Sequence, residues 1–261
     1  MTGALESRNI SKVFETPRGR IEALRSVGFT ATPNEFLCLV GPSGCGKTTL
    51  LKILAGILEP TAGGVVFHSR NGAPPRNALV FQEHGLFPWM TVLENVAFGL
   101  EMQGVGRRER VEASLGFIRK VGLERYCGSY PLELSVGMRQ RVALARAFVS
   151  KAQILLLDEP FGSLDAQTRL LLQQELLSLW ALEKKLVVFV THDIDEAILL
   201  ADRILVLSGA PGTIRAELRV DLPRPRDPTG DAWVAAVSLR RTIWEMLEQE
   251  VRKGLYGRGE E

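Results

Sequence analysis

Short apolar runs alternate with longer segments of mixed polarity along most of the chain. Each run holds four or five uncharged residues, and the runs predict strands over residues 36–40, 78–81, 154–157, 186–190 and 204–207. Several are apolar on both faces, as is typical of a parallel sheet that is covered by helices on both sides. Strands of this kind, separated by helical segments, predict an α/β fold.

The segments between these runs have the apolar spacing of helices. Helices are predicted over residues 48–57 and 165–185, and the Asp165 side chain is suited to cap the first turn of the second one. Residues 90–150 are helical in pattern, contain turns and lack a clear strand. We therefore expect a helical subdomain that is inserted into the α/β core.

The composition changes again near residue 209. Glycine and proline at 209–212 predict a hairpin turn, and a closing amphipathic helix is predicted over 232–251, after a proline-rich connection. The expectation is a single domain over residues 1–261. Its parts are an α/β core at about 1–89 and 151–208, a helical subdomain at about 90–150 and a C-terminal extension at about 209–261.

Composition and charge argue against several classes of protein. The 261 residues are 46% hydrophobic, which is ample for a large core. The net charge of +2 does not suggest the basic face of a nucleic-acid-binding protein, so we expect no nucleic-acid partner. The three cysteines form no C-x-x-C pair, which favours a reducing cytoplasm over a disulfide framework or a zinc site. No stretch approaches the roughly 20 apolar residues of a membrane span, so a role at a membrane requires another chain as anchor.

A glycine-rich stretch, GPSGCGKTT, follows the first predicted strand and precedes a helix. It matches the pattern G-x-x-x-x-G-K-[ST], in which glycines let backbone N–H groups surround a phosphate chain at a helix N-terminus. Lys47 can supply charge to the β- and γ-phosphates, and the Thr48 hydroxyl can bind Mg²⁺. The predicted nucleotide-binding residues here are Gly41, Pro42, Ser43, Gly44, Cys45, Gly46, Lys47, Thr48 and Thr49.

Cys45 lies inside this stretch, near Lys47 and the start of the predicted helix. Both features favour a thiolate, so we expect Cys45 to be the most nucleotide-sensitive of the three thiols. The alternative is a small residue that packs beneath the loop with its sulfur turned inward.

Two further strands carry polar residues at their carboxyl ends, where α/β sheets bind ligands. The strand at 154–157 leads into Asp158, which can hold Mg²⁺, and Glu159, which can deprotonate an attacking water. An acidic pair could instead cap a helix, but the presence of a phosphate-binding stretch in the same chain favours a catalytic role for the pair. The strand at 186–190 leads to His192, which we expect at the same edge of the sheet.

In order along the chain, these segments resemble the ATP-binding subunit of an ABC transporter. Residues 41–49 resemble the Walker A motif of this family, and ILLLDEP at 154–160 resembles its Walker B motif with the catalytic glutamate. LSVGMRQR at 134–141 resembles the family signature, which other P-loop ATPases lack. The resemblance runs from about residue 10 to 208 and implies a P-loop core of the ABC-ATPase type.

The resemblance assigns roles to residues outside these motifs. Phe14 stands where an aromatic ring stacks on adenine, Gln82 stands in the Q-loop, and Asp165 stands in the D-loop. His192 stands at the position of the switch histidine. With ATP and Mg²⁺ as the implied cofactors, the implied catalytic residues are Glu159, His192 and Gln82, and the implied metal ligands are Thr48, Gln82 and Asp158.

The resemblance also implies a head-to-tail dimer of two copies, in which Ser135 and Gly137 of one copy contact the γ-phosphate held by the other. The family pattern L-S-G-G-Q is changed here at Val136 and Met138. Methionine occurs at that place in the importer branch, whereas valine at the third place is less usual. A Cβ there limits positive φ and close approach, so we expect Val136 to weaken the contact across the dimer.

Residues 81–105 and 220–227 resemble the nitrate, sulfonate and taurine importer ATPases in particular. The implied partners are a membrane permease, contacted from the cytoplasmic face, and through it a substrate-binding protein. Leu86, Phe87 and Trp89 are suited to contact the permease, or alternatively they fill the core of the helical subdomain.

Other functions stay open at this point. A non-transport ABC ATPase that acts on DNA or ribosomes usually carries a long coiled-coil insertion or a second cassette, and neither is present. A regulator that binds nucleotide without hydrolysis is disfavoured by intact Lys47, Glu159 and His192. An ABC importer of another substrate class is a third alternative.

Overall fold

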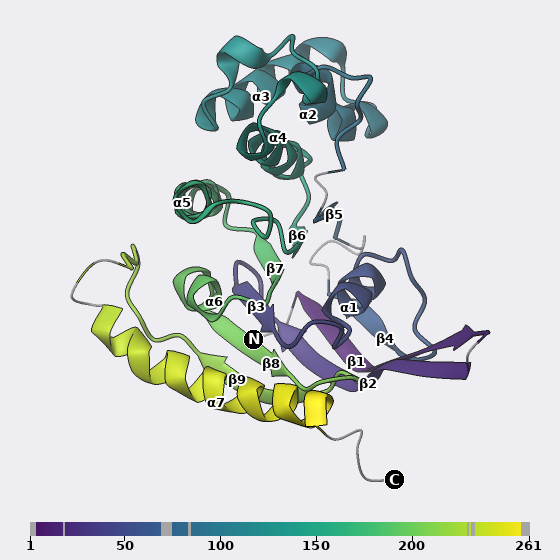
Figure 1. Cartoon of the computed structure of the whole chain (residues 1–261). Coiled ribbons are helices and arrows are strands. Elements are labelled where there is room, and N and C mark those ends of the chain that lie inside the picture. The colour runs from purple at the N-terminus through teal and green to yellow at the C-terminus, as the bar shows by residue number, and fades with distance from the viewer. Residues whose placement is uncertain are drawn as a thin grey trace. The chain divides into compact units, whose positions relative to one another are not determined.

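The chain divides into two compact units, one formed by residues 1–74 and 186–261 and the other by residues 75–185. The computed structural model in Figure 1 describes residues 4–17, 19–68, 75–82, 85–228, 230 and 233–256.

A sheet of parallel strands forms the centre of the first unit. Strand β3 (Phe36–Val40) pairs in parallel with β7 (Leu186–Thr191) and with β8 (Arg203–Leu207), and β9 (Ile214–Arg219) pairs with β8 in the antiparallel direction. Every residue of β3 and β7 is buried. The expectation of apolar strands that are buried on both faces is therefore confirmed for this part of the chain.

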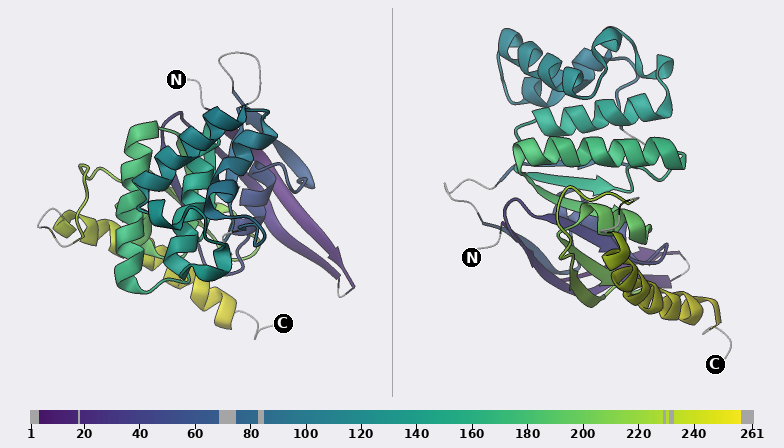
Figure 2. Two further views of the ribbon diagram at one scale, coloured as in Figure 1. Left: turned by 90° about the horizontal axis from the view of Figure 1, so that it is seen from above. Right: turned by 90° about the vertical axis from the view of Figure 1, so that its left-hand side faces the viewer.

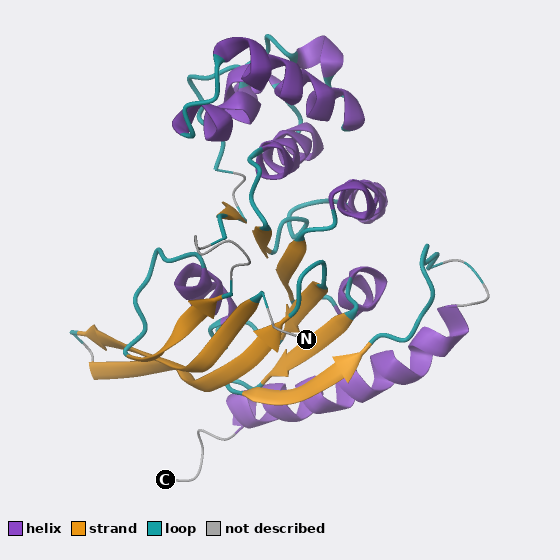
Figure 3. Cartoon of the chain, turned by 180° about the vertical axis from the view of Figure 1, so that it is seen from behind, coloured by secondary structure: helices purple, strands orange, loops and turns teal. Residues whose placement is uncertain are grey.

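Helices complete this unit. Helix α1 (Lys47–Leu54) contacts β7, and α6 (Ile194–Leu200) contacts both β3 and β7. The long helix α7 (Val234–Tyr256) packs against α6 and β8 and runs alongside β9 (Figures 1 and 3). The hairpin turn predicted at 209–212 lies between β8 and β9, and the closing helix extends five residues beyond its predicted end at 251.

A second, antiparallel sheet in this unit was not predicted. Its strands β1 (Leu5–Thr16), β2 (Gly19–Ala31) and β4 (Ala62–Phe67) follow the order β2-β1-β4. Many of their side chains are exposed, and the register shifts near Asn9, whose φ is 48°. Polar faces and bulges interrupt the alternation by which half-buried strands are recognised, so the pattern gave no clear signal.

The second unit combines two strands with helices. Strands β5 (Asn77–Val80) and β6 (Ile154–Asp158) pair in parallel, and α5 (Ala166–Glu183) follows β6. Between the strands lie α2 (Val92–Met102), α3 (Arg107–Lys120), two short 3₁₀ turns, η1 (Glu124–Tyr126) and η2 (Pro131–Glu133), and α4 (Val136–Val149). Figure 2 shows α4 and α5 in successive layers beneath α2 and α3, and residues 90–150 contain helices without a strand, as predicted.

Local signals explain where these helices begin. Thr91 and Glu94 form a capping box at the start of α2, and Asp165 caps α5 as predicted, by accepting a hydrogen bond from the backbone N–H of Thr168 at 3.0 Å. Among the helices that the structure describes, none is both long and apolar enough to cross a membrane.

Candidate nucleotide-binding site

The phosphate loop, residues 41–46, connects β3 to α1. Gly44 and Gly46 have φ angles of 78° and 97°, in the left-handed region that favours glycine. A Cβ on Gly46 would lie 2.7 Å from the carbonyl oxygen of Ala23, so a side chain has no space there. Gly46 is therefore needed both for the conformation of the loop and for its close approach to β2.

Lys47 crosses the phosphate loop from its C-terminal side. Its ammonium group donates hydrogen bonds to the carbonyl oxygens of Gly41 at 2.8 Å and Pro42 at 2.9 Å. Helix α1 begins at Lys47, has no side-chain N-cap and carries no acidic residue in its first turn, in which Thr48 is exposed. Its first backbone N–H groups and the positive end of its dipole are thus arranged to bind an anion.

Cys45 packs beneath the phosphate loop. The residue is only 1% exposed, and a Cβ on Gly41 would lie 2.8 Å from its sulfur. The structure therefore favours the small packed residue over the accessible thiol. Cys38 is also buried, in β3, where desolvation raises the pKa of its thiol well above the ordinary value.

The switch loop, residues 192–195, follows β7 and includes the first two residues of α6. The Asp193 side chain caps α6 by accepting a hydrogen bond from the backbone N–H of Glu196 at 3.1 Å. The backbone N–H of Asp193 donates in turn to the Thr191 hydroxyl at 3.0 Å. These contacts hold the backbone on both sides of His192, whose side chain is exposed at the carboxyl end of β7.

A cavity of about 700 Å³ joins the phosphate loop to the switch loop. Its lining comprises Gly41–Ser43, His192–Asp195 and five residues of α7, among them Arg240 and Trp244. The structure thus brings His192 and the phosphate loop to one cavity. The contribution of α7 to the cavity lining was not predicted from the sequence, although the spacing of four between Arg240 and Trp244 places them on one helix face.

The acidic pair lies in the second unit, at the end of β6. Asp158 is the last residue of the strand and is buried, and Glu159 follows with a φ of 43°. Positive φ is uncommon for a residue with a side chain, and such strain is concentrated at functional sites. The pair therefore ends the strand as predicted rather than capping a helix, because the cap of α5 is Asp165. Hydrogen bonds from the following backbone lower the pKa of Asp165.

The signature segment forms the start of α4. The Ser135 side chain is the N-cap and accepts a hydrogen bond from the backbone N–H of Met138 at 3.3 Å. Val136 is exposed and helical, so its position does not require a positive φ, and that reason for a weakened contact is wrong. A Cβ on Gly137 would lie 3.1 Å from Thr168, so this glycine permits a close approach to α5.

The aromatic residues after β5 divide between core and surface. The Phe87 ring lies 4.6 Å from Phe98 and 5.5 Å from Trp89 between centroids, and the Arg146 guanidinium lies 5.8 Å from its centroid. Trp89 is 69% exposed. Phe87 therefore contributes to the helical packing, whereas Trp89 is available for a partner. Gln82 is also exposed.

Phe14 lies in β1 of the first unit and is half-buried. The Lys12 ammonium stands 5.2 Å from its ring centroid. The predicted site residues are thus distributed over both units. The first unit holds Phe14, residues 41–49 and His192, and the second holds Gln82, the signature, Asp158, Glu159 and Asp165.

Comparison with known proteins gives consistent results. A family model described as "ABC transporter" matches residues 24–162. An uncharacterized ABC transporter ATP-binding protein of Methanocaldococcus jannaschii is 47% identical, over 96% of this chain and 94% of its own length. The nitrate import ATP-binding protein NrtD of Synechocystis is 42% identical, over 84% of this chain and 83% of its own. The aliphatic sulfonates import ATP-binding protein SsuB of Bacillus cereus is 42% identical, over 92% and 94%.

Solved structures extend the comparison to the fold. A dimeric bacterial ABC transporter cassette superposes with a TM-score of 0.71 at 32% identity, and the match covers 83% of this chain and 98% of that one. The same TM-score, identity and coverage apply to a cassette dimer in a post-hydrolysis state with ADP and phosphate. These structures share the α/β architecture described above.

Proposed function

Because the chain belongs to the ABC transporter family and is an ATPase, we propose that it powers the import of a small anion, with nitrate, sulfonates and taurine as candidates. The observation that carries this proposal is the identity with the nitrate and sulfonate import proteins over most of the chain. Taurine rests on the resemblance of residues 81–105 and 220–227 alone.

The phosphate loop fits the nucleotide that the family binds. Its positive-φ glycines, the Lys47 ammonium and the uncapped start of α1 converge on one turn of backbone, which suits a chain of phosphates. Phe14 stacks on the adenine in this proposal. Thr48, Gln82 and Asp158 would hold Mg²⁺, which when bound would neutralise charge on the phosphate oxygens.

Hydrolysis is proposed to depend on Glu159, with help from Gln82 and His192. Glu159 takes a proton from water while the water oxygen bonds to the γ-phosphorus and the bond from that phosphorus to the bridging oxygen breaks. His192 donates a hydrogen bond to the γ-phosphate, and its place beside Gly41–Ser43 in one cavity supports this role. ADP and phosphate are the products.

The working form in this proposal is a head-to-tail pair of copies. Ser135 and Gly137 of each copy contact the γ-phosphate held by the other, and Asp165 lies at the contact between copies. The N-terminus of a 14-residue helix without an acidic residue in its first turn is favourable for that anion. Val136 and Met138 stand beside these residues in the same turn.

The membrane partner is proposed to be a permease that binds around Trp89 from the cytoplasmic side and receives substrate from a binding protein. Trp89 is exposed beside the half-buried Phe87, which gives a partner an aromatic anchor on a fixed base. Trp89→Ala should therefore reduce copurification of the permease at least tenfold while the chain retains nucleotide binding. Leu182→Ala is the matched control, because Leu182 is similarly exposed on α5.

Transport itself is tested by reconstitution of the full complex in vesicles. ATP hydrolysis and uptake should rise together when the binding protein carries nitrate, an alkanesulfonate or taurine. Stimulation by a different class of solute would replace the substrate assignment and keep the importer. If the chain copurifies with no membrane protein and its ATP hydrolysis does not respond to one, the non-transport ATPase would be favoured instead.

A further inference from the structure

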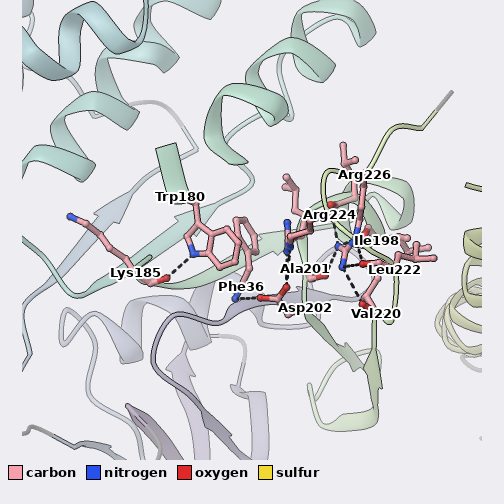
Figure 4. Close-up of polar contacts among 12 residues, drawn as sticks. Phe36, Trp180, Lys185, Ile198, Ala201, Asp202, Val220, Leu222, Arg224 and Arg226 are labelled. Carbon is pink, nitrogen blue, oxygen red and sulfur yellow. Dashed lines mark hydrogen bonds and ion pairs between the residues drawn. The ribbon is translucent and has the colours of Figure 1, made fainter. Parts of the chain in front are cut away.

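The C-terminal extension holds the last turn of α6 through one buried arginine. The Arg226 guanidinium donates hydrogen bonds to the carbonyl oxygens of Ile198 at 2.9 Å, Leu199 at 3.2 Å and Ala201 at 2.6 Å (Figure 4). The same group also binds the carbonyl oxygens of Val220 at 3.1 Å and Leu222 at 3.2 Å. Carbonyls at a helix end have no partner within the helix, so Arg226 satisfies them and places a positive charge at the negative end of the dipole.

Burial lowers the pKa of Arg226 to about 10, which leaves the guanidinium charged at neutral pH. Only 8% of the residue is exposed. A buried, charged side chain that donates to five carbonyl groups is costly to replace, because each acceptor would lose its partner. Its contacts therefore determine where the end of α6 lies.

A second arginine ties the same helix end to the strand that leads into the phosphate loop. Arg224 donates a hydrogen bond to the carbonyl oxygen of Leu200 and pairs with Asp202 at 2.8 Å (Figure 4). The other carboxylate oxygen of Asp202 accepts from the backbone N–H of Phe36, the first residue of β3, at 2.9 Å. Arg224 thus links the end of α6 to the start of β3.

A third arginine contacts the opposite end of α6. The Nε of Arg240, on α7, pairs with Asp195 at 3.1 Å, and Asp195 stands three residues after His192. Helix α7, which carries Arg240, is itself held in place by buried and hydrogen-bonded side chains. Within α7, the Ile243 side chain is fully buried, and the Glu250 carboxylate accepts a hydrogen bond from the backbone N–H of Gly209 at 3.0 Å.

We propose that Arg224, Arg226 and Arg240 form an α6 clamp, by which the C-terminal extension positions His192 for its step at the γ-phosphate. Helix α6 has only seven residues, and a helix that short is not stable without external contacts. The three arginines supply such contacts at both ends. They are positioning residues, since none touches the phosphate loop through the contacts described, and the inference rests on the proposed role of His192.

The clamp should influence the rate of hydrolysis more than the affinity for nucleotide. The phosphate loop keeps its own contacts through Lys47 and Gly46, which the three arginines do not share. His192 acts only on the γ-phosphate, and small displacements of a catalytic group reduce rate strongly. A loosened α6 is therefore expected to lower kcat and leave KM for ATP nearly unchanged.

Arg240→Glu in the full-length chain is the first test, because Arg240 is 61% exposed and its loss leaves the core intact. We expect kcat to fall about 3- to 5-fold, as for the loss of an exposed ion pair, with the dissociation constant for ATP within twofold. Arg241→Glu is the matched control, because Arg241 is on the same helix but pairs with Glu245, whereas Asp195 pairs with Arg240. Asp195→Arg combined with Arg240→Glu should restore most of the lost rate.

Arg226→Lys and hydrogen exchange provide the second test. Lysine keeps the charge but lacks the planar fork of donors, so α6 amides should exchange faster and kcat should fall. If Arg226→Lys does not fold, the Arg240 series decides alone. The clamp would be overturned by any one of three results. These are an unchanged kcat in Arg240→Glu, an equal fall of kcat in Arg241→Glu, and no recovery of kcat when Asp195→Arg is combined with Arg240→Glu.

His192→Ala in the same assay separates this inference from the proposed function. A fall in kcat for His192→Ala without one for Arg240→Glu rejects the clamp and keeps the role of His192. An unchanged kcat for His192→Ala rejects that role, and the clamp with it.

Discussion

The phosphate loop and the switch loop follow two paired strands, β3 and β7, yet they are held in different ways. The hydrogen bonds from Lys47 to Gly41 and Pro42 hold the phosphate loop within a few residues. The switch loop has a local cap at Asp193, but α6 behind it is also contacted at both ends by side chains from beyond residue 220.

The difference shows how the two tasks are divided. Binding of phosphates needs backbone N–H groups and one cation, and a short motif supplies both. Positioning of a group for the chemical step needs a side chain to be held from outside its own loop. Substitutions in the first region should therefore change affinity, and substitutions that affect the chemical step should change rate.

Glu159→Gln is expected to have the largest effect on the rate side of this division. The amide keeps the shape of the side chain but cannot accept a proton, so kcat should fall about 10²- to 10⁴-fold while ATP still binds. Single-turnover hydrolysis and a nucleotide titration measure the two quantities separately. Glu183→Gln, at the exposed end of α5, should leave both unchanged. A rate within about twofold of the unsubstituted chain would contradict the role of Glu159.

Lys47→Ala and His192→Ala together test the division directly. Loss of the Lys47 ammonium should raise the dissociation constant for ATP about 10- to 100-fold, as expected for hydrogen bonds to a charged group. His192→Ala should bind ATP within twofold of the unsubstituted chain and lose rate instead. Equilibrium titrations with a fluorescent ATP analogue measure both variants. An equal loss of affinity in the two would remove the distinction between the loops.

Gly46→Ala tests whether the phosphate loop is fixed by its backbone. A methyl group at φ 97°, 2.7 Å from the Ala23 carbonyl oxygen, should destabilise the folded chain by about 1–3 kcal/mol and weaken ATP binding. Gly116→Ala is the control, because it lies inside α3 with open space around its Cβ. It should raise stability by about 0.5–1 kcal/mol. Denaturant unfolding measures both, and equal effects of the two substitutions would show that neither φ nor space is limiting at Gly46.

The same contrast explains what could be predicted from the sequence. The phosphate loop, the buried strand β3 and the cap at Asp165 depend on neighbouring residues, so their local patterns are sufficient. The contact of Arg226 with α6 joins residues 25 to 28 positions apart, and nothing in a local pattern specifies it. The strands β1 and β2 were missed for a related reason, because their exposed faces and the bulge near Asn9 hide the alternation.

Val136 shows how a prediction from a motif can rest on a backbone conformation that the structure does not have. The signature does begin a helix at this residue, with Ser135 as the N-cap. The expectation that a Cβ would weaken the contact between copies rested on positive φ as well as on close approach, and the structure contradicts the first of these grounds. Since Val136 is helical, its side chain adds surface at the first turn without strain.

Val136→Gly should consequently have the smallest effect of these substitutions. ATP affinity should be unchanged, and hydrolysis should stay within about twofold, because glycine is tolerated at the start of a helix and the Ser135 cap remains. Ser135→Ala is the informative companion, since it removes a cap that contributes about 0.5–2 kcal/mol and also the hydroxyl proposed to contact the γ-phosphate. Its loss of rate should persist at saturating ATP. If Val136→Gly instead abolishes turnover while α4 stays folded by circular dichroism, the valine side chain itself takes part in the contact between copies. In that case the affinity for ATP and the rate of hydrolysis are coupled through the signature.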